Sequence, residues 1–188
     1  ALAQRHLQQA LFYLKSLLSE QLNPLQLLAA MINQVRKLIV ARDFLDDPLG
    51  RSWRPGLPYA AFRQEVMPDI VDFDRALIAL LQSWHKKGAG DAAVKSGKTK
   101  NNPKIKSDIL LAPNPANAYP VYLLLQRAAL FTSAELAFIL SDLHRVDATL
   151  KSAGRNPEAV LTRAVLGICK PTVASGHTAI RYTPPPGG

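Results

Sequence analysis

The chain has 188 residues, of which 48% are hydrophobic and only 7% aromatic, and its formal net charge is +9 at pH 7. This length allows one well-buried core, and the hydrophobic content excludes disorder for most of the chain. No stretch has the apolar length of a membrane span and no signal peptide opens the sequence, so we expect a cytoplasmic protein. The single cysteine, Cys169, excludes an internal disulfide.

Two amphipathic helices are expected at the start of the chain. The second helix follows the capping pair Asn23-Pro24, and the first covers about residues 2–21 with one apolar side formed by Leu7, Leu11, Leu14, Leu17 and Leu18. Because the linking turn is short, we expect the two helices to be antiparallel neighbours. The chain begins with Ala1 rather than methionine and is helical by its first few residues, which suggests a piece of a longer protein.

The segment from Asp46 to Pro58 contains three prolines, two glycines and Trp53, which predicts a loop whose tryptophan folds back on the core. A short helix to Met67 is expected next, and Pro68-Asp69 should restart the chain as a further helix. The expected buried face of that helix consists of Ile70, Phe73, Leu77, Leu80, Leu81 and Trp84. Acidic residues form two groups, and helix capping explains them better than acid–base catalysis: Asp43, Asp46 and Asp47, and Asp69, Asp72 and Asp74.

Apolar periodicity is lost between residues 86 and 118, which predicts a mobile insertion rich in lysine. Flexible cationic segments contact phosphate backbones, so the candidate nucleic-acid contacts are Lys95, Lys98, Lys100, Lys104 and Lys106. A solvated loop remains the alternative, since the segment has no aromatic residue for base stacking. Residues 92–99 fit a relaxed phosphate-loop pattern, but no strand precedes them and no helix follows, so we interpret the match as accidental.

The last part of the chain carries clear helix signals. Tyr119-Pro120 starts one helix, Thr132 and Glu135 form a capping box for the next, and Asn156-Pro157 caps the last, which reaches Cys169. The tail, residues 171–188, is expected to be extended or disordered. The sequence therefore predicts an all-α, antiparallel bundle of about six to seven helices over residues 1–170, with the insertion at 86–118.

The sequence offers no pattern that predicts an active site. The four histidines are scattered without metal-ligand spacing, and Cys169 lies on the apolar side of its helix, as expected of a buried structural thiol. We therefore expect no catalytic residue, metal or cofactor in this chain, and no small-molecule substrate. An enzyme of unknown type is the least favoured class.

Three parts of the sequence resemble a known family. They are the hairpin around Asn23-Pro24-Leu25, the Tyr119-Pro120 restart that leads into Leu125-Gln-Arg-Ala128, and the ending from Leu143-His-Arg-Val-Asp147 to Cys169. Together they resemble the carboxy-terminal domain of the delta subunit of bacterial DNA polymerase III. The similarity is clearest over about residues 125–169 and recognisable over 7–38, and it is weaker over 44–84.

The resemblance implies a clamp-loader subunit whose helical third domain packs into a circular collar with the other subunits. In that family the two amino-terminal domains form an ATPase-like module that opens the sliding clamp, so this chain would be the non-catalytic assembly domain. We take its last two helices as the candidate subunit interface, with Arg145, Lys151, Arg155, Leu161 and Arg163. The alternative is a free-standing helical module that binds nucleic acid through the lysine-rich segment.

Overall fold

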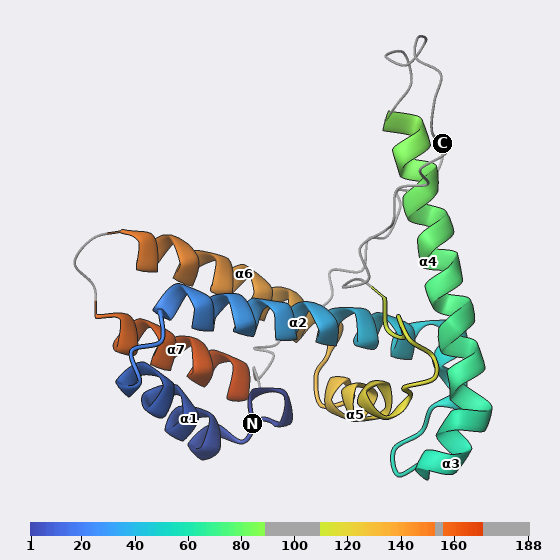
Figure 1. The fold of residues 1–188 in the computed structure, drawn as a ribbon, viewed down its shortest axis with the longest axis horizontal. Coiled ribbons are helices and arrows are strands. Elements are labelled where there is room, and N and C mark those ends of the chain that lie inside the picture. Colours follow the sequence, from blue (N-terminus) through green and yellow to red (C-terminus); the bar gives the residue numbers. More distant parts are fainter. Residues whose placement is uncertain (89–109, 153–155, 171–188) are drawn as a thin grey trace, which may run out of the picture.

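A computed structural model describes residues 1–88, 110–152 and 156–170 (Figure 1). Every regular element in these residues is helical, which confirms the all-α prediction. The α-helices are α1 (Leu7–Ser19), α2 (Pro24–Asp46), α3 (Tyr59–Ala61), α4 (Met67–Gly88), α5 (Tyr119–Ala128), α6 (Ser133–Lys151) and α7 (Pro157–Cys169). Two 3-10 turns, Leu2–Gln4 and Pro48–Ser52, and a π-helical turn, Phe62–Val66, complete the described part, and the predicted tail at 171–188 lies outside it.

The helix starts agree with the sequence signals. Asn23 and Asn156 each accept the backbone N–H two residues further on, at 2.9 and 3.0 Å. Thr132 and Glu135 form the predicted capping box, in which Thr132 Oγ1 accepts the N–H of Glu135 at 3.1 Å and Glu135 Oε2 accepts the N–H of Thr132 at 2.9 Å. These bonds satisfy N–H groups that the start of a helix leaves without intrahelical partners.

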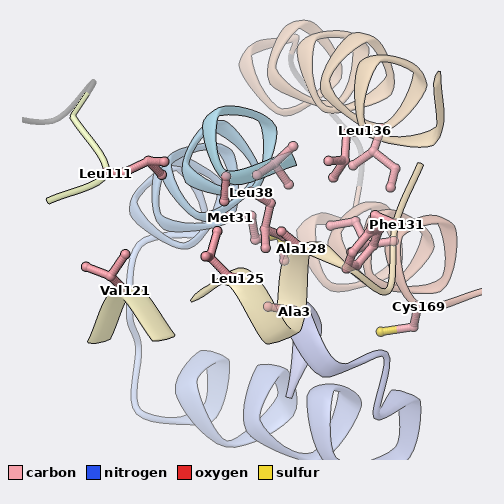
Figure 2. Close-up of a cluster of buried hydrophobic side chains, with 14 of the residues drawn as sticks. Ala3, Met31, Leu38, Leu111, Val121, Leu125, Ala128, Phe131, Leu136 and Cys169 are labelled. Atoms are coloured by element: carbon pink, nitrogen blue, oxygen red, sulfur yellow. The ribbon is translucent and has the colours of Figure 1, made fainter. Parts of the chain in front are cut away.

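Helix α2 lies at the centre of the bundle. Helices α5, α6 and α7 pack against it, and α7 also packs against α6 and α1 (Figure 1). Figure 2 shows the core that they share, where Met31 and Leu38 of α2 lie close to Leu125 of α5 and Leu136 of α6. Helix α1 packs mainly against α7, although its neighbour in sequence is α2.

The segment after α2 folds back on the core. Its 3-10 turn Pro48–Ser52 packs so closely on the end of α2 that a Cβ at Gly50 would lie 2.1 Å from the carbonyl oxygen of Phe44. Trp53 follows, and its ring centroid lies 6.1 Å from that of Phe62 and 6.0 Å from that of Tyr122. The prediction that this tryptophan returns to the core is confirmed.

The predicted helix break at Pro68 was wrong. Helix α3, the π-helical turn Phe62–Val66 and α4 follow one another without a gap, so the chain stays helical from Tyr59 to Gly88. Proline lacks an N–H and its ring crowds the carbonyl four residues earlier. The wider π-turn contains the residue four positions before Pro68, so it makes room for the ring and allows the helix to continue.

The described residues at the two ends of the predicted insertion belong to the fold. Helix α4 extends to Gly88, and Leu111 and Ala112 are buried. Asp74 of α4, which is 6% exposed, accepts the N–H of Leu111 at 2.9 Å and that of Ala112 at 2.8 Å. Asp74 thus anchors this segment and does not cap a helix, contrary to the prediction. Residues 89–109 of the predicted insertion lie outside the described residues.

The apolar face of α4 is buried only near the start of the helix. Ile70 is fully buried, whereas Leu80 and Trp84 are 46% and 59% exposed. Figure 1 shows the reason, because α4 projects away from the other helices. The expectation that this face is buried as far as Trp84 was therefore wrong for the second half of the helix.

No single helix in the described part of the chain combines the length and hydropathy of a membrane span. Helices α5 and α6 pass that test only as a pair, and the chain bends by 94° between them. Apolar residues of both helices, Leu125 and Leu136 among them, lie in the core (Figure 2).

Candidate subunit interface

Three cationic residues of the predicted interface lie on the surface of the last two helices. Arg145 and Lys151 are on α6, Arg163 is on α7, and all three are exposed. Lys151 Nζ pairs with Asp147 Oδ2 at 2.6 Å within the same helix, while Arg145 and Arg163 form no ion pair with a described residue. Exposed charges of this kind affect partner choice and association rate more than stability.

The remaining predicted contacts are not on this surface. Leu161 is 0% exposed and belongs to the core of the bundle, so its side chain is removed from the candidate interface. Its apolar character was read correctly, but the face of α7 that carries it packs inward. Arg155 lies outside the described residues, as do the lysines proposed as nucleic-acid contacts: Lys95, Lys98, Lys100, Lys104 and Lys106.

An apolar groove lies between α1 and α2, with a volume of about 330 Å³. It exists because α1 packs on α7 and because small side chains line the facing surfaces of α1, α2 and the start of the chain. The lining includes Ala3, Ala10, Leu14, Leu17, Ala30 and Met31. A groove with such walls suits the apolar face of a helix from another protein.

Large apolar side chains are exposed beside this groove. Phe12 and Tyr13 of α1 are 69% and 49% exposed, their ring centroids lie 5.7 Å apart, and Tyr13 lines the groove. Leu22, in the turn that joins α1 to α2, and Leu25, in the first turn of α2, are also exposed. Aromatic and apolar side chains gathered on one surface are typical of protein interfaces.

Sequence reasoning overlooked Phe12 and Tyr13 because the leucine stripe of α1 accounted for the buried face. The sequence nevertheless contained a signal that Phe12 is a surface residue. Residues two apart on a helix point about 200° away from each other, so Phe12 does not share the face of Leu14. A large aromatic residue opposite a complete apolar stripe has no core position left and must face solvent or a partner.

Arg5 fixes the start of the chain at one end of the groove. Its Nε donates to the carbonyl oxygen of Leu130 at 3.1 Å, its guanidinium pairs with Glu135 at 2.9 Å, and it lies 4.0 Å from the ring centroid of Phe131. Burial by itself raises the pKa of Glu135, but the hydrogen bonds from the Thr132 N–H and from Arg5 outweigh it, so the pKa is lowered. The groove wall formed by Ala3 is thereby held in place.

In the described residues, the thiol of Cys169 and the carboxyl group of Asp74 are both buried in the fold. Cys169 is buried, as expected, and burial raises the pKa of its thiol, which disfavours the reactive thiolate. Burial also raises the pKa of Asp74, while its two backbone hydrogen bonds act in the opposite direction. Among the described residues no group of three or more His, Cys, Asp or Glu side chains is placed to hold a metal ion.

The described surface therefore combines an apolar groove, exposed aromatic residues beside it, and cations on neighbouring helices, an arrangement suited to contact with another protein. Comparison of the chain with protein-family models, curated proteins and solved structures found no significant match.

Proposed function

We propose that this chain is a non-catalytic assembly domain of the delta subunit of bacterial DNA polymerase III, a cytoplasmic protein of DNA replication. It packs with the other clamp-loader subunits so that the sliding clamp can be loaded on DNA. The sequence resemblance over residues 125–169 supports the family, and the all-α fold agrees with a helical collar. The observation that carries an assembly role is the apolar groove between α1 and α2, with the exposed side chain of Tyr13 in its wall.

In this proposal a helix of a neighbouring subunit lays its apolar face into the groove. Burying a Phe or Leu side chain completely contributes roughly 1.5–3 kcal/mol, so a few anchors are sufficient for a specific complex. Tyr13 is the anchor offered by this chain, because it lines the groove and is still 49% exposed, whereas Phe12 projects from another side of α1. Arg145 and Arg163 are exposed on α6 and α7 and do not line the groove, so they would affect partner choice rather than form its apolar centre.

Light scattering after size-exclusion chromatography tests the proposal, with the chain alone and mixed with the other clamp-loader subunits from the same source. The wild-type chain is expected to join a stable mixed complex at moderate salt. The variant Tyr13→Ser should weaken that complex by about tenfold or more, because it removes the anchor that lines the groove. Leu80→Ser is the matched control, since it removes an exposed apolar side chain from α4, far along the chain from the groove.

Two outcomes would contradict parts of this proposal. A complex that survives Tyr13→Ser and is lost in the double variant Arg145→Glu, Arg163→Glu would move the interface to α6 and α7. Absence of any complex, although the partners assemble with the full-length subunit, would reject this chain as a sufficient assembly domain. Salt-sensitive DNA binding that is lost on deletion of residues 95–106 would then favour the nucleic-acid-binding module.

A further inference from the structure

A second, larger hollow lies along α2 and shares Gln34 and Arg127 with the groove described above. Its volume is about 530 Å³, and it is bounded by α2, by the segment 110–118 and by α5. Its apolar wall includes Val40, Leu111, Val121 and Leu124. Asp74 holds the segment 110–118 in position through the two backbone hydrogen bonds described above.

The charged residues that line this hollow are both cations. Lys37 of α2 is exposed and Arg127 of α5 is half-buried, and no Asp or Glu is among the lining residues. Neither side chain forms a hydrogen bond or an ion pair with any described residue. A guanidinium offers five N–H donors in a planar fork that matches a carboxylate, so a half-buried and unpaired arginine favours an anionic ligand.

The start of α5 adds a second positive end to the hollow. Pro120 and Val121, in the first turn of α5, line it, and the N-cap residue Ala118 has no side-chain acceptor for the first backbone N–H groups. Uncapped N–H groups and the helix dipole both attract an anion at this end. Arg127 lies seven residues further along α5, about 10 Å away at 1.5 Å per residue, with Val121 and Leu124 between the two ends.

We propose that this hollow binds an acidic segment of a partner protein in an extended conformation. One carboxylate pairs with Arg127 and Lys37, a second lies at the start of α5, and apolar side chains between them contact Val121 and Leu124. An extended chain rises about 3.3 Å per residue, so the two acidic residues are about three positions apart. The proposal does not depend on the subunit interface at α1.

Charge decides which class of occupant fits. Within this chain, residues 89–109 contain five lysines against Asp91 and Asp108, and residues 171–188 contain Arg181 and no acidic residue. Neither segment complements a cationic hollow, so neither is the proposed occupant. Nucleic acid is disfavoured because no aromatic side chain lines the hollow for base stacking and only two cations face it.

Selection of peptides from a randomised phage-displayed library on the wild-type chain tests this site. Recovered peptides should be enriched in Asp and Glu together with Leu, Ile or Phe. Labelled copies of these peptides, measured by fluorescence anisotropy, should bind more weakly at high salt and about tenfold more weakly to Arg127→Gln. Lys37→Gln should weaken binding in the same direction, whereas Arg36→Gln, an exposed neighbour that does not line the hollow, should not.

Lys37→Gln is the decisive variant, because Arg127 also lines the groove between α1 and α2 and Lys37 does not. Lys37 is exposed, so its substitution leaves the fold intact, and thermal unfolding verifies this for both variants. Recovery of no peptide, recovery of neutral or basic peptides, or binding that neither variant changes would overturn the proposal. Labelled oligothymidylate that binds through Lys37, or a Lys37-dependent dimer of this chain, would overturn it in favour of a different occupant.

Discussion

Glu135 illustrates how one side chain serves two structural roles. Its carboxylate completes the capping box of α6 by accepting the N–H of Thr132, and it also pairs with Arg5, which is 130 positions away in the sequence. Both members of the pair have side chains that are only about 15% exposed, so the pair is shielded from solvent. The start of the chain is therefore tied to the corner between α5 and α6 by a charged group whose ionisation depends on pH.

Glu135→Gln is expected to reduce stability at neutral pH and to lose this effect in acid. Because the pKa of Glu135 is lowered on folding, the ionised carboxylate stabilises the fold above the ordinary pKa of 4.5, and this contribution is lost as the pH falls through the folded-state pKa. Hydrogen bonds to a charged group contribute about 1.5–3 kcal/mol. Urea unfolding of both proteins over a series of pH values measures the difference, and a difference that stays constant into acid would contradict this account.

Asp74→Ala tests the anchor between α4 and the segment 110–118. The substitution leaves the N–H groups of Leu111 and Ala112 buried without their acceptor, which costs about 1–3 kcal/mol for each group. We expect the free energy of unfolding to fall by about 2–4 kcal/mol, measured by chemical denaturation. Asp72→Ala on the same helix removes only an exposed pair with Arg75 and should change stability by less than about 1 kcal/mol. Equal effects would show that Asp74 does not act through its hydrogen bonds.

At the scale of elements, the helix caps are local devices whose contributions can be measured separately. Asn156→Ala removes the acceptor at the start of α7 and should lower the free energy of unfolding by about 1 kcal/mol. For a chain of this length that corresponds to a decrease in Tm of about 2–4 °C by calorimetry. Asn33→Ala, in the exposed middle of α2, should leave Tm unchanged or slightly higher, because alanine favours a helix and no cap is lost. Similar Tm values for the two variants would argue against a capping role.

Helix α4 is covered by the other helices over only part of its length, which its own sequence pattern does not reveal. Its apolar spacing is that of a buried face, and near Ile70 the face is buried. Further along, Leu80 and Trp84 have the same spacing but extend beyond the bundle, where no described helix covers them. The sequence also did not predict that the chain stays helical through Pro68. No sequence signal distinguishes the π-turn that accommodates this proline from a helix break.

At the scale of the whole molecule, the packing partner of α1 decides where the candidate interface lies. A short turn joins α1 to α2, which predicts close antiparallel packing, but α1 packs against α7 at the other end of the chain. The space left between α1 and α2 is the apolar groove, and Phe12 and Tyr13 remain exposed beside it. The predicted charged residues Arg145 and Arg163 are on the surface, whereas the apolar centre of the candidate site was not predicted.

The all-α class and the helix starts at Asn23, Thr132 and Asn156 were predictable from the residues alone, because capping and apolar periodicity depend on residues within about one helical turn. The burial of Leu161 and the anchoring of a distant segment by Asp74 follow instead from how the helices pack. The packing of the helices also created the groove between α1 and α2 and the larger hollow beside α5. The physical reason is the same in each case: burial and hydrogen bonding between elements depend on which helices become neighbours, and the local pattern of one helix does not encode its neighbours.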